Sequence, residues 1–281
     1  MNYFKTFMLM MGLMVFALGV GYYLRGPQGM ISAFLFALLM NFVMYFFSDK
    51  MVLMQTGARA VTEEEAPDLY RMLRSLTVKA KMPMPRVYVM DDPSPNAFAT
   101  GRDPSHAAVA VTTGILKTLD PRQLQAVLGH ELSHVKNRDI LIMTVAATFS
   151  GMLMMLTNIF YGFGNRNSEN RNPLGMIVVM LLAPIAATLI QLAISRSREY
   201  DADRGGAQLT SPRDMIGALE GIHAGIARRP MAEASPSSAH LFIANPFSAK
   251  GVSRMFMTHP SLEERVEALQ ALSGRSSVIS D

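Results

Sequence analysis

Residues Ala126 to Asp139 read AVLGHELSHVKNRD, and this stretch decides how the rest of the chain is interpreted. His130 and His134 stand four residues apart, and Glu131 directly follows the first of them. On a helix, residues four apart lie on one face, so both imidazoles can reach a single metal ion. Glu131 lies about 100° further round, where its carboxylate can take a proton from a water held beside the ion.

The motif lies on a predicted helix with a well-defined start. Asp120 is a favourable N-cap residue, Pro121 suits the first helical position, and Gln123 completes a capping box. Two exposed histidines beside a solvated glutamate are the alternative interpretation, and the capped helix favours the metal site. A catalytic zinc ion needs a third protein ligand and one open position for water.

That third ligand has to come from elsewhere in the chain. The metzincin pattern requires a glycine and then a histidine shortly after His134, but Asn137 and Ile140 occupy those positions. Acidic residues recur in SRSREYDADRGGAQL, residues 195–209. Spacing alone leaves three candidates open: Glu199, Asp201 and Asp203. If Glu199 is the ligand, Asp203 can accept a hydrogen bond from one of the ligand histidines.

Four long segments contain no charged residue: 6–24, 26–48, 140–165 and 172–195. About 20 apolar residues span the hydrocarbon core of a bilayer. We therefore expect four transmembrane helices, which we place at about 6–24, 30–47, 140–163 and 174–195. Buried core helices are the alternative, and uncharged segments of this length argue against them. A cleaved signal peptide at the start is disfavoured, because no small-residue cleavage site precedes the second apolar segment.

Positive charges beside these segments predict the orientation in the membrane. Six lysines and arginines flank one side, where residues 49–139 and 196–281 lie, and three flank the other. Because positive residues accumulate on the cytoplasmic side, we expect a multi-pass inner-membrane protein whose polar parts face the cytoplasm. We expect a transmembrane hairpin at 1–48 to precede the polar region, and a second hairpin at 140–195 to divide that region into two parts.

The polar parts mix helices with a few strands. RVYVMDD, NAFATG and HAAVAVTTG predict a small sheet ahead of the motif helix, whereas Arg229 to Thr258 is predicted to be a long loop. The chain has no cysteine, and no arrangement of serine, histidine and aspartate stands out, so we assign no covalent nucleophile. Despite a pI near 9.4, no motif points to nucleic acid or to an organic cofactor.

Five segments, in this order and with these apolar stretches, resemble one family: PNAFATG, AAVAVTTGIL, GHELSHVKNRD, SRSREYDADRGGA and THPSLEERVEAL. The chain resembles the HtpX-type membrane zinc metalloproteases, which are gluzincins related to the CAAX prenyl proteases. The likeness covers nearly the whole chain and is far more specific than the two-histidine motif. It implies a membrane α-helical protein with four transmembrane helices and an α+β gluzincin-like domain, in which a small sheet accompanies the active-site helix.

The resemblance also implies the zinc site. Glu199 becomes the third ligand beside His130 and His134, for one Zn²⁺ ion per chain, and Glu131 becomes the general base. Asp203 matches the family's aspartate that supports a ligand histidine from behind.

Four further residues receive roles from the resemblance. Asn96 and Ala97 match the edge strand that pairs with the substrate backbone. His259 matches a histidine that helps to stabilise the tetrahedral intermediate, and Arg265 matches a supporting position. No motif supports the remaining histidines, which we expect to be structural or exposed: His106, His223 and His240.

The implied function is zinc-dependent cleavage of membrane proteins or unfolded polypeptides at cytoplasmic segments, in membrane-protein quality control. Because His134 and Glu199 must share one ion, both ends of the second hairpin lie on one side, and the site sits just above the lipid. A prenyl-protein protease is one alternative, although four spans leave no evident cage for a lipidated peptide. A second alternative is a non-catalytic chaperone or scaffold that zinc stabilises, but Glu131 would have no structural role in such a protein.

Overall fold

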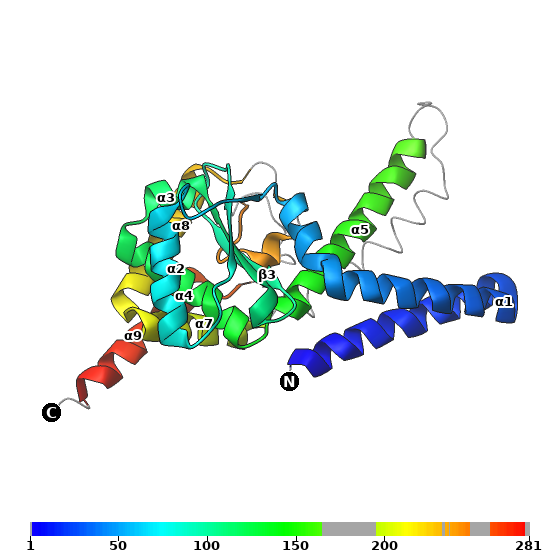
Figure 1. Cartoon of the computed structure of the whole chain (residues 1–281), viewed down its shortest axis with the longest axis horizontal. Helices are drawn as coiled ribbons and strands as arrows, with labels where there is room; N and C mark the ends of the chain where they lie inside the picture. Colours follow the sequence, from blue (N-terminus) through cyan, green and yellow to red (C-terminus); the bar gives the residue numbers. More distant parts are fainter. Residues whose placement is uncertain (1, 165–194, 232–233, 236, 248–258, 279–281) are drawn as a thin grey trace.

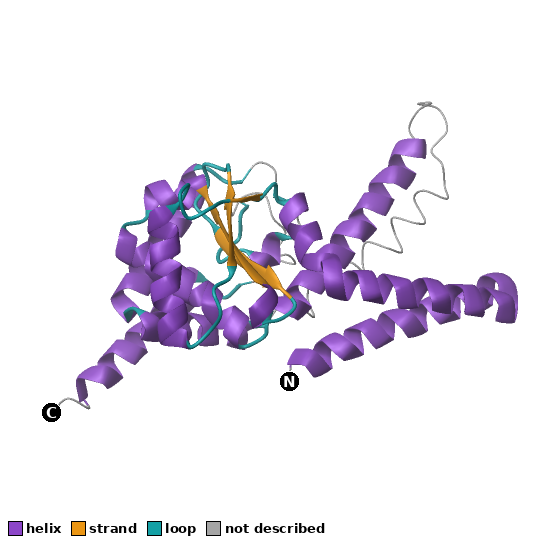
Figure 2. Ribbon diagram, viewed as in Figure 1, coloured by secondary structure: helices purple, strands orange, loops and turns teal. Residues whose placement is uncertain are grey.

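A small sheet and the helices around it form the polar part of the molecule, and long apolar helices extend from it (Figures 1 and 2). The structure, a computed structural model, describes residues 2–164, 195–231, 234–235, 237–247 and 259–278. The fourth predicted transmembrane segment, at 174–195, therefore lies outside the described residues except for its last position.

The N-terminal helix α1 (Asn2–Gln55) is a hairpin of two helical arms. The chain turns at Arg25 and Gly26, where Gly26 adopts a φ of 61° that suits glycine, and Pro27 opens the second arm. The arms approach closely beside the turn, because a Cβ atom on Gly21 would lie 2.5 Å from the carbonyl oxygen of Gly29.

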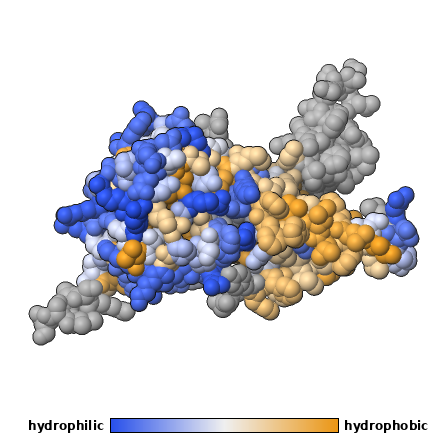
Figure 3. Space-filling view, viewed as in Figure 1, coloured by the Kyte–Doolittle hydropathy of each residue, from blue (hydrophilic) through white to orange (hydrophobic). Residues whose placement is uncertain are grey.

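Both arms are long and apolar enough to cross a membrane. The candidate spans are Thr6–Tyr23 and Arg25–Gln55, and only 11% of the residues in the apolar 18-residue stretch of each are buried. Figure 3 shows this apolar surface projecting from the hydrophilic part of the molecule. The two predicted N-terminal spans are therefore found as helices.

The third predicted span has a different environment at its start. Helix α5 (Ile140–Gly164) follows the motif helix α4 (Pro121–Lys136) at an angle of 91°. Within the described residues, these two helices are long and apolar enough to cross a membrane only if they are taken together as one bent span. The first turns of α5 are buried against α1 and the sheet, so this end of the segment lies in the protein interior.

The sheet has four strands in the order β1-β2-β4-β3. They are β1 (Arg59–Ala60), β2 (Arg86–Met90), β3 (Ala97–Gly101) and β4 (Ala107–Thr112). β4 runs parallel to β2, with Arg86 opposite Ala108, and antiparallel to β3, with Ala97 opposite Val111. The small sheet predicted from the sequence is confirmed.

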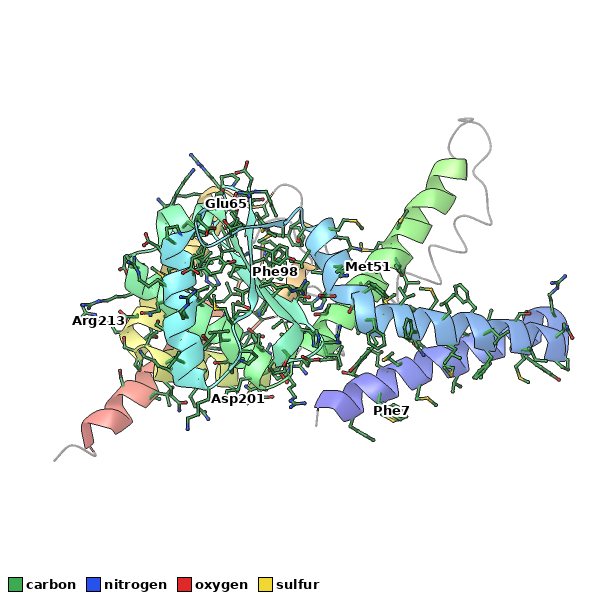
Figure 4. The ribbon with its side chains drawn as sticks, in the orientation of Figure 1. Phe7, Met51, Glu65, Phe98, Asp201 and Arg213 are labelled. Carbon is green, nitrogen blue, oxygen red and sulfur yellow. The ribbon has the colours of Figure 1, made fainter. Side chains whose placement is uncertain are left out.

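Side chains alternate between the two faces of this sheet, and each face has its own core. Ala97, Ala99 and the valines of β4 pack with α2 (Pro67–Ala80), α4 and α8 (Pro212–Arg228). Phe98 points the other way, toward the end of α1 and the start of α5 (Figure 4). α4 thus crosses one face of the sheet, which places the motif directly under β3.

The predicted long loop contains ordered structure where it is described. Residues 237–244 are all buried, include the 3-10 helix η2 (Ala239–Leu241), and lie beside β3 through an isolated bridge between Phe98 and Phe242. The apolar residues of this segment follow no regular spacing because its side chains enter two different hydrophobic cores. Leu241 and Phe242 pack on one face of the sheet, and Ile243 packs in the core of the other face.

Candidate metal centre

Helices α4 and α7 (Arg196–Leu209) bring the site together, and glycines let them approach closely. A Cβ atom on Gly206 would lie 2.9 Å from the backbone nitrogen of His130 and 3.0 Å from the carbonyl oxygen of Ala126. Any side chain at position 206 would therefore push the helices apart. The predicted start of α4 is confirmed, because Asp120 and Gln123 form the capping box.

His130, His134 and Glu199 form a cluster whose ligand atoms all lie within 4.8 Å of one another. Nε2 of His134 is 3.6 Å from Oε1 of Glu199, and Nε2 of His130 is 3.9 Å from Oε2. Ligands that each bind zinc at about 2.0–2.2 Å lie roughly 3–4 Å apart, so these separations fit a zinc ion. Nε2 of His130 is buried without a hydrogen-bond partner among the described residues, as expected of a metal ligand.

The structure distinguishes among the three acidic candidates on α7. Asp201 is exposed at the edge of the molecule (Figure 4), where its carboxylate lies 3.8 Å from Arg204. Asp203 is buried behind His130, with Oδ1 accepting a hydrogen bond of 2.9 Å from Nδ1. Only Glu199 joins the two histidines in the cluster.

Arg265, on α9 (Leu262–Val278), completes the arrangement behind His130. Its Nε and Nη2 donate to the two oxygens of Asp203 at 2.7 and 2.5 Å, and Nη1 donates to the carbonyl of Ile243 at 2.7 Å. Burial would raise the pKa of Asp203, but Arg265 and His130 lower it to about 2. An ionised Asp203 holds Nδ1 of His130 protonated and leaves the lone pair of Nε2 for a metal.

Asp139 supports His134 in the same way, and the sequence reasoning missed it. Its Oδ2 lies 3.2 Å from Nδ1 of His134, and the side chain is 1% exposed. Burial alone would lower the pKa of His134, but the Asp139 hydrogen bond and the Glu199 charge raise it to about 9. The sequence signal for Asp139 is its position: it lies five residues after His134 and directly before the apolar helix that starts at Ile140.

Glu131 lies beside the cluster in a dry environment. Its side chain is 1% exposed, and Oε1 has no hydrogen-bond partner among the described residues. Burial raises the pKa of Glu131 to about 8, while contact with the backbone of Ala99 on β3 opposes the shift. A carboxyl group with such a pKa is suited to exchange protons near neutral pH.

His259 lies against Glu199 of the cluster. Its Nδ1 donates to Oε2 of Glu199 at 3.0 Å, and its Nε2 is buried without a partner among the described residues. Burial opposes ionisation of Glu199, but His259 and the two ligand histidines hold the pKa of Glu199 well below its usual value. The predicted oxyanion role of His259 stays a prediction, and the hydrogen bond also places His259 where it can orient the Glu199 carboxylate.

The expected substrate edge of the sheet is covered by the chain itself. The backbone nitrogen of Ile243 donates to the carbonyl of Ala97 at 3.0 Å. Nδ2 of Asn96 donates to the carbonyl of Ala244 at 2.9 Å, and Asn96 is fully buried. The two residues predicted to meet substrate therefore lie at the expected edge, but residues 242–244 already occupy it.

The other histidines have local partners. His106 is exposed and contacts Asp103, whereas His240 is buried, with Nε2 donating to the carbonyl of Met143 at 3.1 Å. His223 donates to the carbonyl of Leu219 within α8. None of the three belongs to the metal cluster.

Known proteins share both the sequence and the fold. The sequence profile of peptidase family M48 matches residues 63–273. A protease HtpX homolog of Burkholderia ambifaria (strain MC40-6) is 50% identical over 276 residues, 96% of this chain and 97% of that one. A protease HtpX homolog of Ralstonia pickettii (strain 12J) is 49% identical and covers 96% of each chain.

A solved structure, that of S. mikatae Ste24p, shares the fold. The TM-score is 0.52 at 18% sequence identity, over 95% of this chain. The match covers 65% of the Ste24p chain, so this chain spans less than two thirds of its length. At this identity the likeness extends to the fold alone.

Proposed function

The chain belongs to peptidase family M48, and from this premise we propose that it is a zinc endopeptidase of the inner membrane. Its proposed substrates are misfolded or damaged membrane proteins, which it cleaves in segments that reach the cytoplasm. The buried cluster of His130, His134 and Glu199 carries this proposal, because two imidazoles and a carboxylate form a catalytic zinc set.

The residues around that cluster supply the remaining chemistry. Zinc, when bound by His130, His134 and Glu199, polarises the scissile carbonyl and lowers the pKa of water. The Glu131 carboxylate accepts the proton of the attacking water and delivers it to the leaving amine. The buried environment that raises the pKa of Glu131 makes both transfers accessible near neutral pH. His259 keeps Nε2 available for the developing negative charge, in the role proposed for it.

A substrate backbone has to be held extended beside the metal. Strand β3 offers an edge for such pairing, and its Ala99 backbone is next to Glu131. Because residues 242–244 already pair with that edge, we propose that substrate displaces them. Asn96 and Ala97 would then bind the substrate backbone through the groups that now bind Ala244 and Ile243.

The membrane location rests on the apolar helices and the relatives. Both arms of α1 qualify as spans, and relatives of about 50% identity are protease HtpX homologs. The excess of positive charge beside the polar domain supports a cytoplasmic active site. A site there reaches loops and tails of membrane proteins, which matches a role in quality control.

Exchanging Glu131 for glutamine tests the proposed chemistry. We expect the Glu131→Gln variant to bind zinc normally but to lose hydrolysis of β-casein, because an amide cannot accept the proton. Glu220→Gln makes the same exchange at an exposed site on α8 and should cleave like wild type. Casein cleavage at the wild-type rate by a zinc-loaded Glu131→Gln protein would exclude Glu131 as the general base.

A further inference from the structure

A cavity of about 570 Å³ lies between the end of α4 and the start of α7. On α4 it is lined by Leu132, Ser133 and Lys136, which lie on a different helix face from His130 and His134. The cavity is therefore separate from the metal cluster. Its walls carry four basic side chains and two acidic ones: Lys136, Arg138, Arg198, Arg204, Asp139 and Asp201.

Arg198 in this wall is buried and incompletely bound. It is 9% exposed, and its Nη1 has no hydrogen-bond partner among the residues that the structure describes. Its Nε lies 3.8 Å from Oδ1 of Asp139, which is beyond hydrogen-bond distance. Arg265, the other buried arginine near the site, uses Nε, Nη1 and Nη2 in hydrogen bonds. Burying a charged donor without an acceptor is costly, so Arg198 points to an acceptor that a ligand supplies.

The start of α7 adds further donors to the same cavity. Ser195 and Ser197 both line it, and the side chain of the N-cap residue Ser195 makes no capping hydrogen bond to this 14-residue helix. The first backbone N–H groups of a helix carry partial positive charge and favour anions. The hydroxyl groups of the two serines lie 2.9 Å apart and can turn toward a bound oxygen.

We propose that this cavity binds a phosphate group, held by Nη1 of Arg198, the ammonium group of Lys136 and the start of α7. The phosphate can come from inorganic phosphate or from the headgroup of an anionic phospholipid. The position of the cavity favours the headgroup. Asp139 in its wall directly precedes the apolar helix α5, and Ser195 ends an apolar segment of the sequence. The cavity thus lies at the junction of the polar domain with helix α5, and its wall includes the residue with which the last apolar segment of the sequence ends.

Thermal unfolding of the full-length protein tests this site and needs no activity assay. In detergent, inorganic phosphate should raise the Tm above that in chloride of equal ionic strength. Arg198→Gln and Lys136→Ala should each weaken phosphate binding roughly tenfold, because each removes one charge-assisted hydrogen bond. Arg122→Ala removes an exposed charge near the other end of α4 and should bind phosphate like wild type.

Nanodiscs distinguish the two sources of phosphate. A headgroup site predicts a higher Tm in phosphatidylcholine nanodiscs containing phosphatidylglycerol than in phosphatidylcholine alone, and a smaller gain for both cavity variants. A response to inorganic phosphate without a response to phosphatidylglycerol would assign the site to free phosphate. If wild type responds to neither, or if the exposed Lys136→Ala variant responds fully to both, the proposal is wrong. Lys136 lies at the surface, so this variant remains informative even if Arg198→Gln does not fold.

Discussion

Arg265 binds both carboxylate oxygens of Asp203, at 2.7 Å from Nε to Oδ2 and 2.5 Å from Nη2 to Oδ1. Oδ1 also accepts the hydrogen bond from Nδ1 of His130. A residue on α9, near the C-terminal end, is thereby linked through Asp203 to His130 on α4. The guanidinium fork matches the carboxylate in a way that a lysine ammonium cannot.

We therefore expect Arg265→Lys to weaken zinc binding by roughly 10–100-fold, although the charge is retained. The variant loses the paired hydrogen bonds, so Asp203 and His130 gain freedom to rotate. Competition with a fluorescent chelator measures the zinc Kd, and exposed Arg213→Lys on α8 is the matched control (Figure 4). An unchanged Kd in a folded Arg265→Lys protein would show that this contact does not position His130.

Asp139→Asn should weaken zinc binding by a similar factor, roughly 10–100-fold, because an amide no longer orients Nδ1–H of His134 by charge. Asp201→Asn makes the same exchange at an exposed position of α7 and should leave the Kd unchanged. If both variants bind zinc equally well, Asp139 has no positioning role.

Some of this site could be predicted from sequence, and some could not. The ligand pair and the helix cap are local patterns, so His130, His134 and Asp120 could be identified directly. The role of Asp139 depends on the turn after α4, where Arg138 adopts a φ of 60° and the chain folds back beneath His134. No periodic pattern encodes that turn.

The pairing of β3 with a segment far away in the sequence could not be predicted either. Phe242 reaches Phe98 across more than a hundred residues, and its local sequence resembles an ordinary loop. The start of α5 was ambiguous for a related reason. Hydropathy alone cannot distinguish a segment buried in protein from one buried in lipid, and Ile140 and Leu141 are buried by protein.

A disulfide across the covered edge should stop proteolysis. Phe98 and Phe242 face each other as a non-hydrogen-bonded antiparallel pair, with Cα atoms expected about 4.5 Å apart, within disulfide range. The chain has no cysteine, so the Phe98→Cys/Phe242→Cys variant forms only this bond. We expect the oxidised variant to leave casein intact and a reductant to restore cleavage.

Each single-cysteine variant serves as a control and should be insensitive to the reductant. Both large rings are lost in the double variant, so the comparison is between its own oxidised and reduced states. Equal cleavage in the two states would mean that substrate does not displace residues 242–244.

The orientation in the membrane can be tested by labelling single cysteines. Gln28 is exposed at the turn of α1, and Ser105 is exposed on the polar domain. In spheroplasts, a membrane-impermeant thiol reagent should label Gln28→Cys but not Ser105→Cys, because positive residues gather beside the domain. Labelling of Ser105→Cys alone would reverse the orientation, and labelling of both would contradict the two-arm hairpin.

Because α4 and α5 meet at nearly a right angle, the metal cluster lies at a fixed distance from the apolar helix α5. Three residues separate these helices, so covalent geometry rather than a flexible linker sets the height of the metal above the apolar helix. If the protein lies in the bilayer and cleaves membrane proteins, as proposed, a substrate in the same membrane has to extend its peptide bond at least to that height before Glu131 can act on it. Under the proposed function, tails shorter than this reach would escape cleavage whatever their sequence, and the length of exposed chain would become a criterion by which a damaged protein is selected.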